Sequence, residues 1–175
     1  MLLGMSLART RLVRPQATLE TLKMNSYRGF TLIELLMTVS VMAIIATWAV
    51  PSFQTVMESN RVSTSANSLL SGLQLARSEA SRRGGVVSVC ALDDDWSQGF
   101  AVAADPDCSG ETFKVVHFSR QLHVADNCEA LSVTYWPDGT IDGAGCEFTF
   151  NGGSQTPERT LTLWPAGHAQ IEIDS

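Results

Sequence analysis

An unbroken apolar block near the start of the chain is its strongest pattern. Residues 30–50 read FTLIELLMTVSVMAIIATWAV and carry a single charge, at Glu34. A helix of this length spans about 31 Å at 1.5 Å per residue, close to the roughly 30 Å hydrocarbon core of a bilayer. The pattern therefore predicts one transmembrane half-helix over residues 30–51.

A second, amphipathic half-helix is expected to follow directly, over residues 52–83. Apolar or small residues recur there at three- and four-residue steps, as on one face of a helix. These residues are Phe53, Val56, Met57, Ala66, Leu69, Leu70, Leu73, Ala76 and Ala80. Pro51 removes a helical hydrogen bond, so we expect a bend there. Gly84-Gly85 is expected to end the helix.

After Gly85 the apolar pattern changes to a period of two, which is typical of strands. Seven short strands are expected, separated by turn sequences such as Pro137-Asp138-Gly139. Their ranges are 86–92, 99–103, 113–118, 131–136, 146–150, 160–164 and 169–173. Strands this short predict antiparallel sheets packed on the apolar face of the helix. We therefore expect an α+β fold, in which residues 52–175 form the amphipathic half-helix and one β-sheet head without internal repeats.

Charge is distributed unevenly along the 175 residues, whose formal net charge is -6. Residues 1–28 contain five Lys or Arg and one acid, whereas residues 52–175 contain seven and sixteen, a balance of -9. Under the positive-inside rule the basic start lies in the cytoplasm and everything after Pro51 is exported. The acidic remainder argues against a general nucleic-acid binder.

The junction Arg28-Gly29-Phe30-Thr31-Leu32-Ile33-Glu34-Leu35-Leu36 resembles the class III signal of type IV pilins and type II secretion pseudopilins. The resemblance implies that a membrane prepilin peptidase cleaves between Gly29 and Phe30 and methylates the new amino terminus of Phe30. It also implies that Glu34, the fifth mature residue, pairs with the terminal amine of a neighbouring subunit and sets subunit register. Pro51 matches the proline at which the family helix bends, and the resemblance implies that the α+β fold is pilin-like.

Two alternatives concern the leader, residues 1–29. A conventional secretory signal would be cleaved after residues such as Thr47-Trp48-Ala49. We disfavour it, because the charge at Glu34 costs about 2.5–3.5 kcal/mol in a membrane and has no purpose in a discarded segment. Translation from Met24 would give the leader MNSYRG, which is more typical of class III signals. We therefore favour Met24 as the true start.

A narrower resemblance covers the end of the helix and one turn. LQLARSEASRRG (residues 73–84) resembles the helix-end pattern of the FimT/GspH family, which comprises minor pilins and the H-type pseudopilin, and VTYWPDGT (133–140) resembles its strand–turn. Arg77 and Glu79 are expected on a solvated helix face. Members implicated in DNA uptake carry Gly-Arg-x-Arg, whereas this chain has Gly167-His168-Ala169-Gln170. DNA affinity depends mainly on Lys and Arg, so we expect no nucleic-acid binding.

Four cysteines fall in the exported part, where disulfides form and persist. Equal spacings of eighteen favour Cys90–Cys108 and Cys128–Cys146. Three pairings are possible for four cysteines, so this assignment stays open.

No other motif points to chemistry. Residues 105–111 begin like a calcium loop, but the twelfth position, which needs a bidentate acid, is Val116. The acidic residues here and at 93–95 are expected to form a solvated rim. The three histidines lack metal spacing, and no Gly-x-Ser-x-Gly nucleophile elbow occurs. We expect no enzyme activity, cofactor or metal, and we expect sheet packing for three tryptophans: Trp96, Trp136 and Trp164.

These features predict a minor type IV pilin, a low-abundance structural subunit that helps to initiate assembly and lies at or near the pilus tip. Its expected partners are the major pilin, other minor pilins, the prepilin peptidase and the inner-membrane assembly platform. The expected location is the inner membrane, crossed once with the head in the periplasm, and then the pilus. An H-type pseudopilin of a type II secretion system is the alternative, and a DNA-uptake pilin is a less favoured one.

Overall fold

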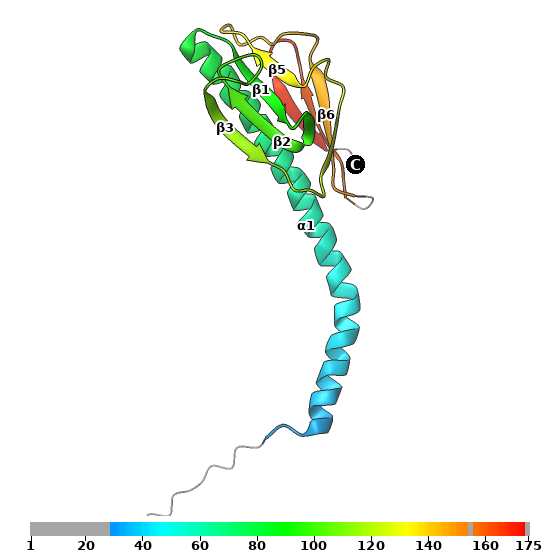
Figure 1. The fold of residues 1–175 in the computed structure, drawn as a ribbon. Coiled ribbons are helices and arrows are strands. Elements are labelled where there is room, and N and C mark those ends of the chain that lie inside the picture. The colour runs from blue at the N-terminus through cyan, green and yellow to red at the C-terminus, as the bar shows by residue number, and fades with distance from the viewer. Residues whose placement is uncertain (1–28, 154–155, 174–175) are drawn as a thin grey trace, which may run out of the picture. The chain divides into compact units, whose positions relative to one another are not determined.

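A computed structural model describes residues 29–153 and 156–173 (Figure 1). The chain divides into two compact units, Met1–Ser40 and Val41–Ser175, each of which is described by itself. Helix α1 (Leu32–Arg83) continues from the first unit into the second and stays helical at Pro51. The leader, including Met24, lies outside the described residues, and the bend at Pro51 stays a prediction.

The end of α1 lies where the glycine pair predicts it. Gly84 adopts a positive φ of 66°, and its N–H donates to the carbonyl of Ala80 at 3.0 Å. Arg82 and Arg83 occupy the last turn, where cations interact favourably with the helix dipole.

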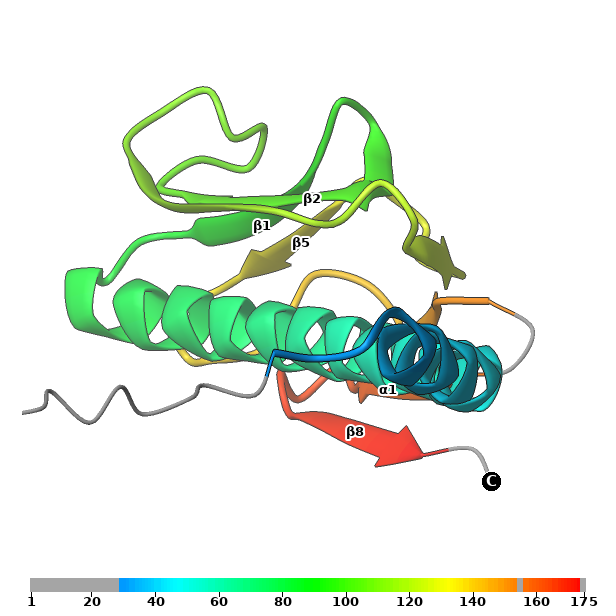
Figure 2. The ribbon, with the colours of Figure 1, turned by 90° about the horizontal axis from the view of Figure 1, so that it is seen from below.

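Eight strands form two antiparallel sheets in the second unit, with the orders β3-β2-β1-β5 and β4-β6-β7-β8. The strands are β1 (Val87–Leu92), β2 (Asp95–Ala103), β3 (Thr112–His117), β4 (His123–Asp126), β5 (Ser132–Tyr135), β6 (Cys146–Asn151), β7 (Arg159–Leu163) and β8 (Ala169–Ile173). Figure 2 shows β1, β2 and β5 on one side of α1 and β8 on the other. The predicted α+β fold, a long helix packed on antiparallel sheets, is confirmed.

Two features of the sheets were not predicted. Strand β2 begins at Asp95 because Asp93 and Asp94 adopt positive φ values of 51° and 57° and turn β1 tightly into β2. Strand β4 was missed because its sequence HVAD has one buried apolar residue, Val124, and so shows no apolar alternation. The N–H of Val124 in β4 donates to the Ser97 hydroxyl of β2 at 3.0 Å, which connects the two sheets.

The face of α1 that packs on the sheets is rich in small residues. Ala66, Ala76 and Ala80 are fully buried, together with Leu69 and Leu73. Such small side chains allow strands to approach the helix backbone closely. The sheets contribute the large residues of the core, which include Trp96, Phe100, Tyr135, Phe148 and Phe150.

The helix face that was predicted to be buried against the sheets extends too far towards the N-terminus. Phe53, Val56 and Met57 are 65%, 55% and 40% exposed, and burial in the core begins at Val62. Gly152, which follows β6, lies against Val62. The head covers the helix only from about this point, and periodicity predicts an apolar face without showing what covers it.

Two disulfides connect loops of the head to its strands. Cys90 in β1 is bonded to Cys108, which lies between β2 and β3. Cys128, which follows β4, is bonded to Cys146 at the start of β6. Each bond closes a sequence separation of 18 residues, for which the chain-entropy estimate gives about 3 kcal/mol of stabilisation.

Candidate processing and assembly site

The expected cleavage site lies outside helix α1. Gly29 and Phe30 precede the first helical residue, Leu32, and both are exposed. The side chain of Phe30 is 83% exposed, and a Cβ added at Gly29 would meet nothing within 4 Å. Exposed segments without regular structure are preferred sites of proteolysis, so the Gly29–Phe30 bond has the local structure that cleavage requires.

Thr31 fixes the start of the helix just beyond this bond. Its hydroxyl accepts a hydrogen bond from the N–H of Glu34 at 3.2 Å, and its carbonyl accepts from the N–H of Leu35 at 3.1 Å. This is the geometry of a helix N-cap. The role of Thr31 was not predicted, although the spacing Thr-x-x-Glu is a sequence signal for a capped helix start.

Glu34 lies in the first turn of α1, where the helix dipole favours a negative charge. Its carboxylate has no hydrogen-bond or ion-pair partner among the described residues. The geometry therefore presents an anion one turn from the residue that would become the amino terminus after cleavage.

The first half of α1 exposes an extensive apolar surface. Its large apolar side chains are each at least 40% exposed: Leu32, Ile33, Leu35, Leu36, Met37, Val39, Val41, Met42, Ile44, Ile45, Trp48, Val50, Phe53, Val56 and Met57. By length and composition α1 is the one helix among the described residues that is able to cross a membrane. Contiguous apolar surface of this kind marks a membrane or protein interaction site.

Arg77 connects the two segments that resemble the FimT/GspH family. Its guanidinium donates to the carbonyl of Ala166 at 3.2 Å, and a Cβ built on Gly139 would lie 2.9 Å from its Nε. The residue is exposed, as expected for a solvated helix face, and it has a specific backbone partner in addition. Arg77 holds the turns around Gly139 and Ala166 against the end of α1.

These two turns share the sequence Trp-Pro-x-Gly, and their packing against each other was not predicted. In each turn the glycine N–H donates to the carbonyl of the tryptophan, at 2.9 Å from Gly139 to Trp136 and at 2.8 Å from Gly167 to Trp164. Both glycines have positive φ, 85° and 73°. A Cβ on Gly167 would lie 2.0 Å from the carbonyl oxygen of Gly139, so the turns pack backbone to backbone.

Of the three tryptophans expected to pack in the sheets, only one is buried. Trp96 is 2% exposed and contacts Phe148 edge-on, with ring centroids 4.8 Å apart. Trp136 and Trp164 are 46% and 39% exposed, and Trp164 stacks on His168. They were assigned wrongly because each lies at a strand end, immediately before a turn, where alternation no longer indicates the inner face.

Glu79 also has specific partners, contrary to the expectation of a solvated face. Its carboxylate accepts hydrogen bonds from Arg82 and from Arg83, the latter at 3.0 Å. These bonds hold the pKa of Glu79 below its ordinary value. Arg83 in turn donates to Glu111 at 2.8 Å and lies over the ring of Phe113. The network attaches the end of α1 to β3.

In the acidic loop of residues 105–111, which begins like a calcium site, the two aspartates contact other residues of the same loop. Asp107 accepts hydrogen bonds from the N–H and hydroxyl of Ser109, at 3.2 and 2.9 Å, which lowers its pKa. Asp105 fills the space beside Gly110. Among the described residues no three His, Cys, Asp or Glu side chains come together as a metal site would require.

Comparisons with known proteins agree with this geometry. The profile of the family described as "Type II transport protein GspH" matches residues 65–167, and the "Prokaryotic N-terminal methylation motif" matches residues 24–50. Comparison with curated protein sequences gives no match.

Solved structures of similar proteins come from two kinds of assembly. The type IV minor pilin FimU of Pseudomonas aeruginosa is 26% identical, with a TM-score of 0.57 over 65% of this chain and 89% of FimU. The minor pseudopilin EpsH of the Vibrio cholerae type 2 secretion system shares the fold at 14% identity, with a TM-score of 0.53 over 65% of this chain and 97% of EpsH. Since the GspH profile covers more than half of the residues, this chain belongs to the GspH family of minor pilins and pseudopilins.

Proposed function

We propose that this chain is a minor type IV pilin that is cleaved between Gly29 and Phe30, methylated on Phe30, and incorporated at or near the pilus tip. The leader, residues 1–29, is removed, residues 30–51 anchor the subunit, and residues 52–175 form the exported part. The single-pass orientation follows from the basic residues before the helix and the acidic balance after it.

The observation that carries this proposal is the combination at the start of α1. An exposed, non-helical Gly29–Phe30 bond is followed by a capped helix that presents an uncovered apolar surface and Glu34, which has no partner within residues 29–153 and 156–173. In a membrane or filament an unpaired carboxylate is costly, so it favours a position opposite a cation. The methylated amine of a neighbouring subunit is the partner that we assign to Glu34.

Similarity to FimU favours a pilus over a secretion system. FimU is a type IV minor pilin and shares 26% of its aligned residues with this chain, whereas the likeness to EpsH, at 14%, concerns the fold alone. The match to the GspH profile supports the second candidate, an H-type pseudopilin. In the source bacterium, deletion of the gene is expected to reduce surface pili and to leave type II secretion unchanged. Reduced secretion with unchanged pili would support the pseudopilin instead.

Glu34→Ala tests the assembly role directly. We expect this variant to be cleaved normally but to be depleted about tenfold or more from sheared filaments, since a charge pair in an apolar environment has been lost. Gly29→Glu is the complementary control and is expected to leave an uncut precursor in the membrane. Normal incorporation of Glu34→Ala would refute the pairing of Glu34 with a terminal amine.

Binding to DNA is not part of the proposal. The segment 167–170, which corresponds to the basic element of DNA-uptake pilins, contains His168 and Gln170, and its Gly167 is buried in packing against Gly139. The nearby guanidinium of Arg77 donates a hydrogen bond to the carbonyl of Ala166. A shift of DNA by the purified chain at physiological salt would overturn this view.

A further inference from the structure

Strand β5 (Ser132–Tyr135) forms one edge of the first sheet, because it pairs with β1 on one side only. The N–H of Ala91 donates to the carbonyl of Leu131, and the register pairs Val89 with Val133. Backbone groups alternate between the two sides of an antiparallel strand. Those of Leu131 and Val133 therefore point to β1, and those of Ser132 and Thr134 point outward.

The outer edge of β5 is covered at one end only. The carbonyl of Thr134 accepts from the N–H of Asp142 at 3.0 Å, and the N–H of Trp136 donates to the carbonyl of Thr140 at 2.9 Å. Within the part of the chain that the structure describes, the outward N–H and carbonyl of Ser132 and the N–H of Thr134 have no protein partner. An edge with free donors and acceptors is a template for another strand.

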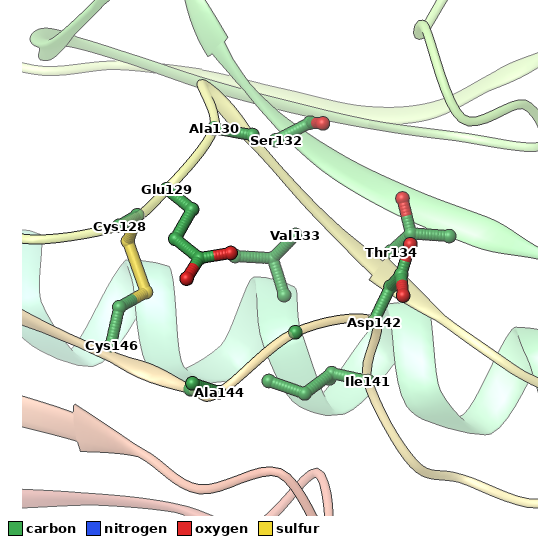
Figure 3. Close-up of a pocket in the computed structure, with 12 residues that line it drawn as sticks. Cys128, Glu129, Ala130, Ser132, Val133, Thr134, Ile141, Asp142, Ala144 and Cys146 are labelled. Atoms are coloured by element: carbon green, nitrogen blue, oxygen red, sulfur yellow. A yellow bond between two sulfur atoms is a disulfide. The ribbon is translucent and has the colours of Figure 1, made fainter.

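A cleft of about 210 Å³ lies beside this free edge, between β5 and residues 141–146 (Figure 3). The Cys128–Cys146 disulfide borders one end, and Val133 and Ile141 supply apolar lining. Small-molecule sites typically measure about 300–1,000 Å³, so the cleft is better matched to one inserted side chain than to a free metabolite.

The charge of the cleft specifies the kind of side chain. Its residues include two acids, Glu129 and Asp142, and no Lys, Arg or His. Neither carboxylate has a hydrogen-bond or ion-pair partner among the described residues. Figure 3 shows Glu129 extending into the space between the two backbone segments, with Asp142 on the opposite wall beside Thr134. A cationic side chain is therefore better matched to this cleft than an anionic one.

We propose that the β5 edge and its cleft bind an extended segment of a different pilin subunit, which adds as a strand along Ser132–Thr134 and inserts a Lys or Arg between Glu129 and Asp142. Main-chain hydrogen bonds supply affinity in this mode of recognition, and the side chain in the pocket supplies specificity. The identity of the partner as a co-assembled pilin rests on the proposed function. The binding chemistry of the cleft does not depend on the proposed function.

Site-specific photo-crosslinking in the source bacterium tests the proposal with the full chain. A p-benzoylphenylalanine at Ser132 is expected to form an adduct whose cross-linked peptide, mapped by mass spectrometry, is an extended, Lys- or Arg-containing segment of another pilin. The same group at Gln170, on the edge strand of the second sheet, is the matched control. No adduct, an adduct with a second copy of this chain, or one with a segment that lacks a basic residue would overturn the proposal.

Charge variants separate the cleft from the proposed function. Glu129→Gln and Asp142→Asn are each expected to reduce the adduct by up to about fivefold, the range of a partly exposed ion pair. Glu172→Gln, an exposed acid on β8, should not change it. All three are expected to be cleaved at Gly29 normally, so a lost adduct on a processed protein reports on the cleft. An unchanged adduct in the Glu129→Gln/Asp142→Asn double variant would refute the charge argument.

A backbone variant tests the added strand. Ser132→Pro removes an N–H that points away from β1, a position at which an edge strand tolerates proline. We expect the variant to fold, as judged by unchanged fluorescence of the buried Trp96, and to lose the adduct formed from a photo-crosslinker placed at Ala130 of the cleft instead. A folded Ser132→Pro variant that retains this adduct would exclude strand addition.

Discussion

Gly72 allows a close contact between α1 and Phe100 of the first sheet, and substitution with alanine tests how the head is packed. A Cβ at this position would lie 2.3 and 2.8 Å from two ring carbons of Phe100. Ordinary van der Waals contacts of a Cβ are about 3.4–4 Å, so the ring or the helix has to move by about 1 Å. Phe100 is fully buried and packs edge-on against Phe118, which leaves the ring little room.

Two opposing effects determine the result of Gly72→Ala. Replacement of a helical glycine by alanine contributes about 1 kcal/mol through helix propensity. Overpacking of a well-packed core costs about 1–3 kcal/mol, and contacts this short favour the upper half of that range. We therefore expect the head to lose about 1–2 kcal/mol of stability, equivalent to a Tm lower by about 4–8 °C.

The measurement is thermal unfolding of the full chain in detergent with its disulfides intact, followed by tryptophan fluorescence. Trp96 is the buried tryptophan of the head, so its exposure reports unfolding. Ser81→Ala, at an exposed position of the same helix, is the control and should change stability by less than about 0.5 kcal/mol. In a Phe100→Leu background Gly72→Ala should cost less. A variant that is stabilised by about 1 kcal/mol, as at a solvated helix position, would refute the close packing.

Two further predictions concern the head. Non-reducing peptide mapping is expected to recover Cys90 linked to Cys108 and Cys128 linked to Cys146, and a peptide that joins Cys90 to Cys128 or Cys146 would contradict the structure. Hydrogen bonds from Thr140 lower the pKa of Asp138, and similar bonds lower those of Asp95 and Asp107. Because the folded state favours the carboxylate, its stabilisation is present above the ordinary aspartate pKa of about 3.9 and is lost as the pH falls through the lower folded values. The free energy of unfolding, measured in urea, should decline across that pH range, and Asp138→Asn should make the decline smaller. A decline that Asp138→Asn leaves unchanged would count against the Thr140 bonds.

The sequence predicted those parts of the fold that depend on local pattern. The helix, its end at Gly84 and seven of the strands follow from apolar periodicity and turn residues, because these signals lie within a few residues of the elements that they specify. The class III signal likewise lies in consecutive residues, so the sequence alone indicates the family. Strand β4 was missed because it has a single buried residue, Val124, whereas the equally short β5 alternates between buried and partly exposed positions.

Features that depend on distant neighbours were predicted poorly. Phe53 was predicted to lie on the covered face of the helix together with Leu69, yet only Leu69 is covered, since coverage depends on where the strands end in space. Arg77 has the sequence context of a solvated residue, and only the fold brings the Gly139 and Ala166 turns to it. The β5 cleft was not predicted for the same reason: Glu129 and Asp142 are thirteen positions apart and share no motif.

The different coverage of the two halves of α1 has a consequence for how such a subunit is used. From Val62 onward the apolar face is covered by the sheets of the same chain, so the folding of the head does not require another subunit to supply its core. From Leu32 to Met57 the apolar side chains are exposed, and burial of each large one is worth about 1.5–3 kcal/mol. Lipid satisfies this surface as well as protein does, so apolar burial alone gives little preference for one register of packing over another. Under the proposed function, a single carboxylate at Glu34, which lipid does not neutralise, supplies that preference. We therefore expect substitutions among the exposed apolar residues to weaken retention in membrane and filament together, and Glu34→Ala to affect the filament selectively.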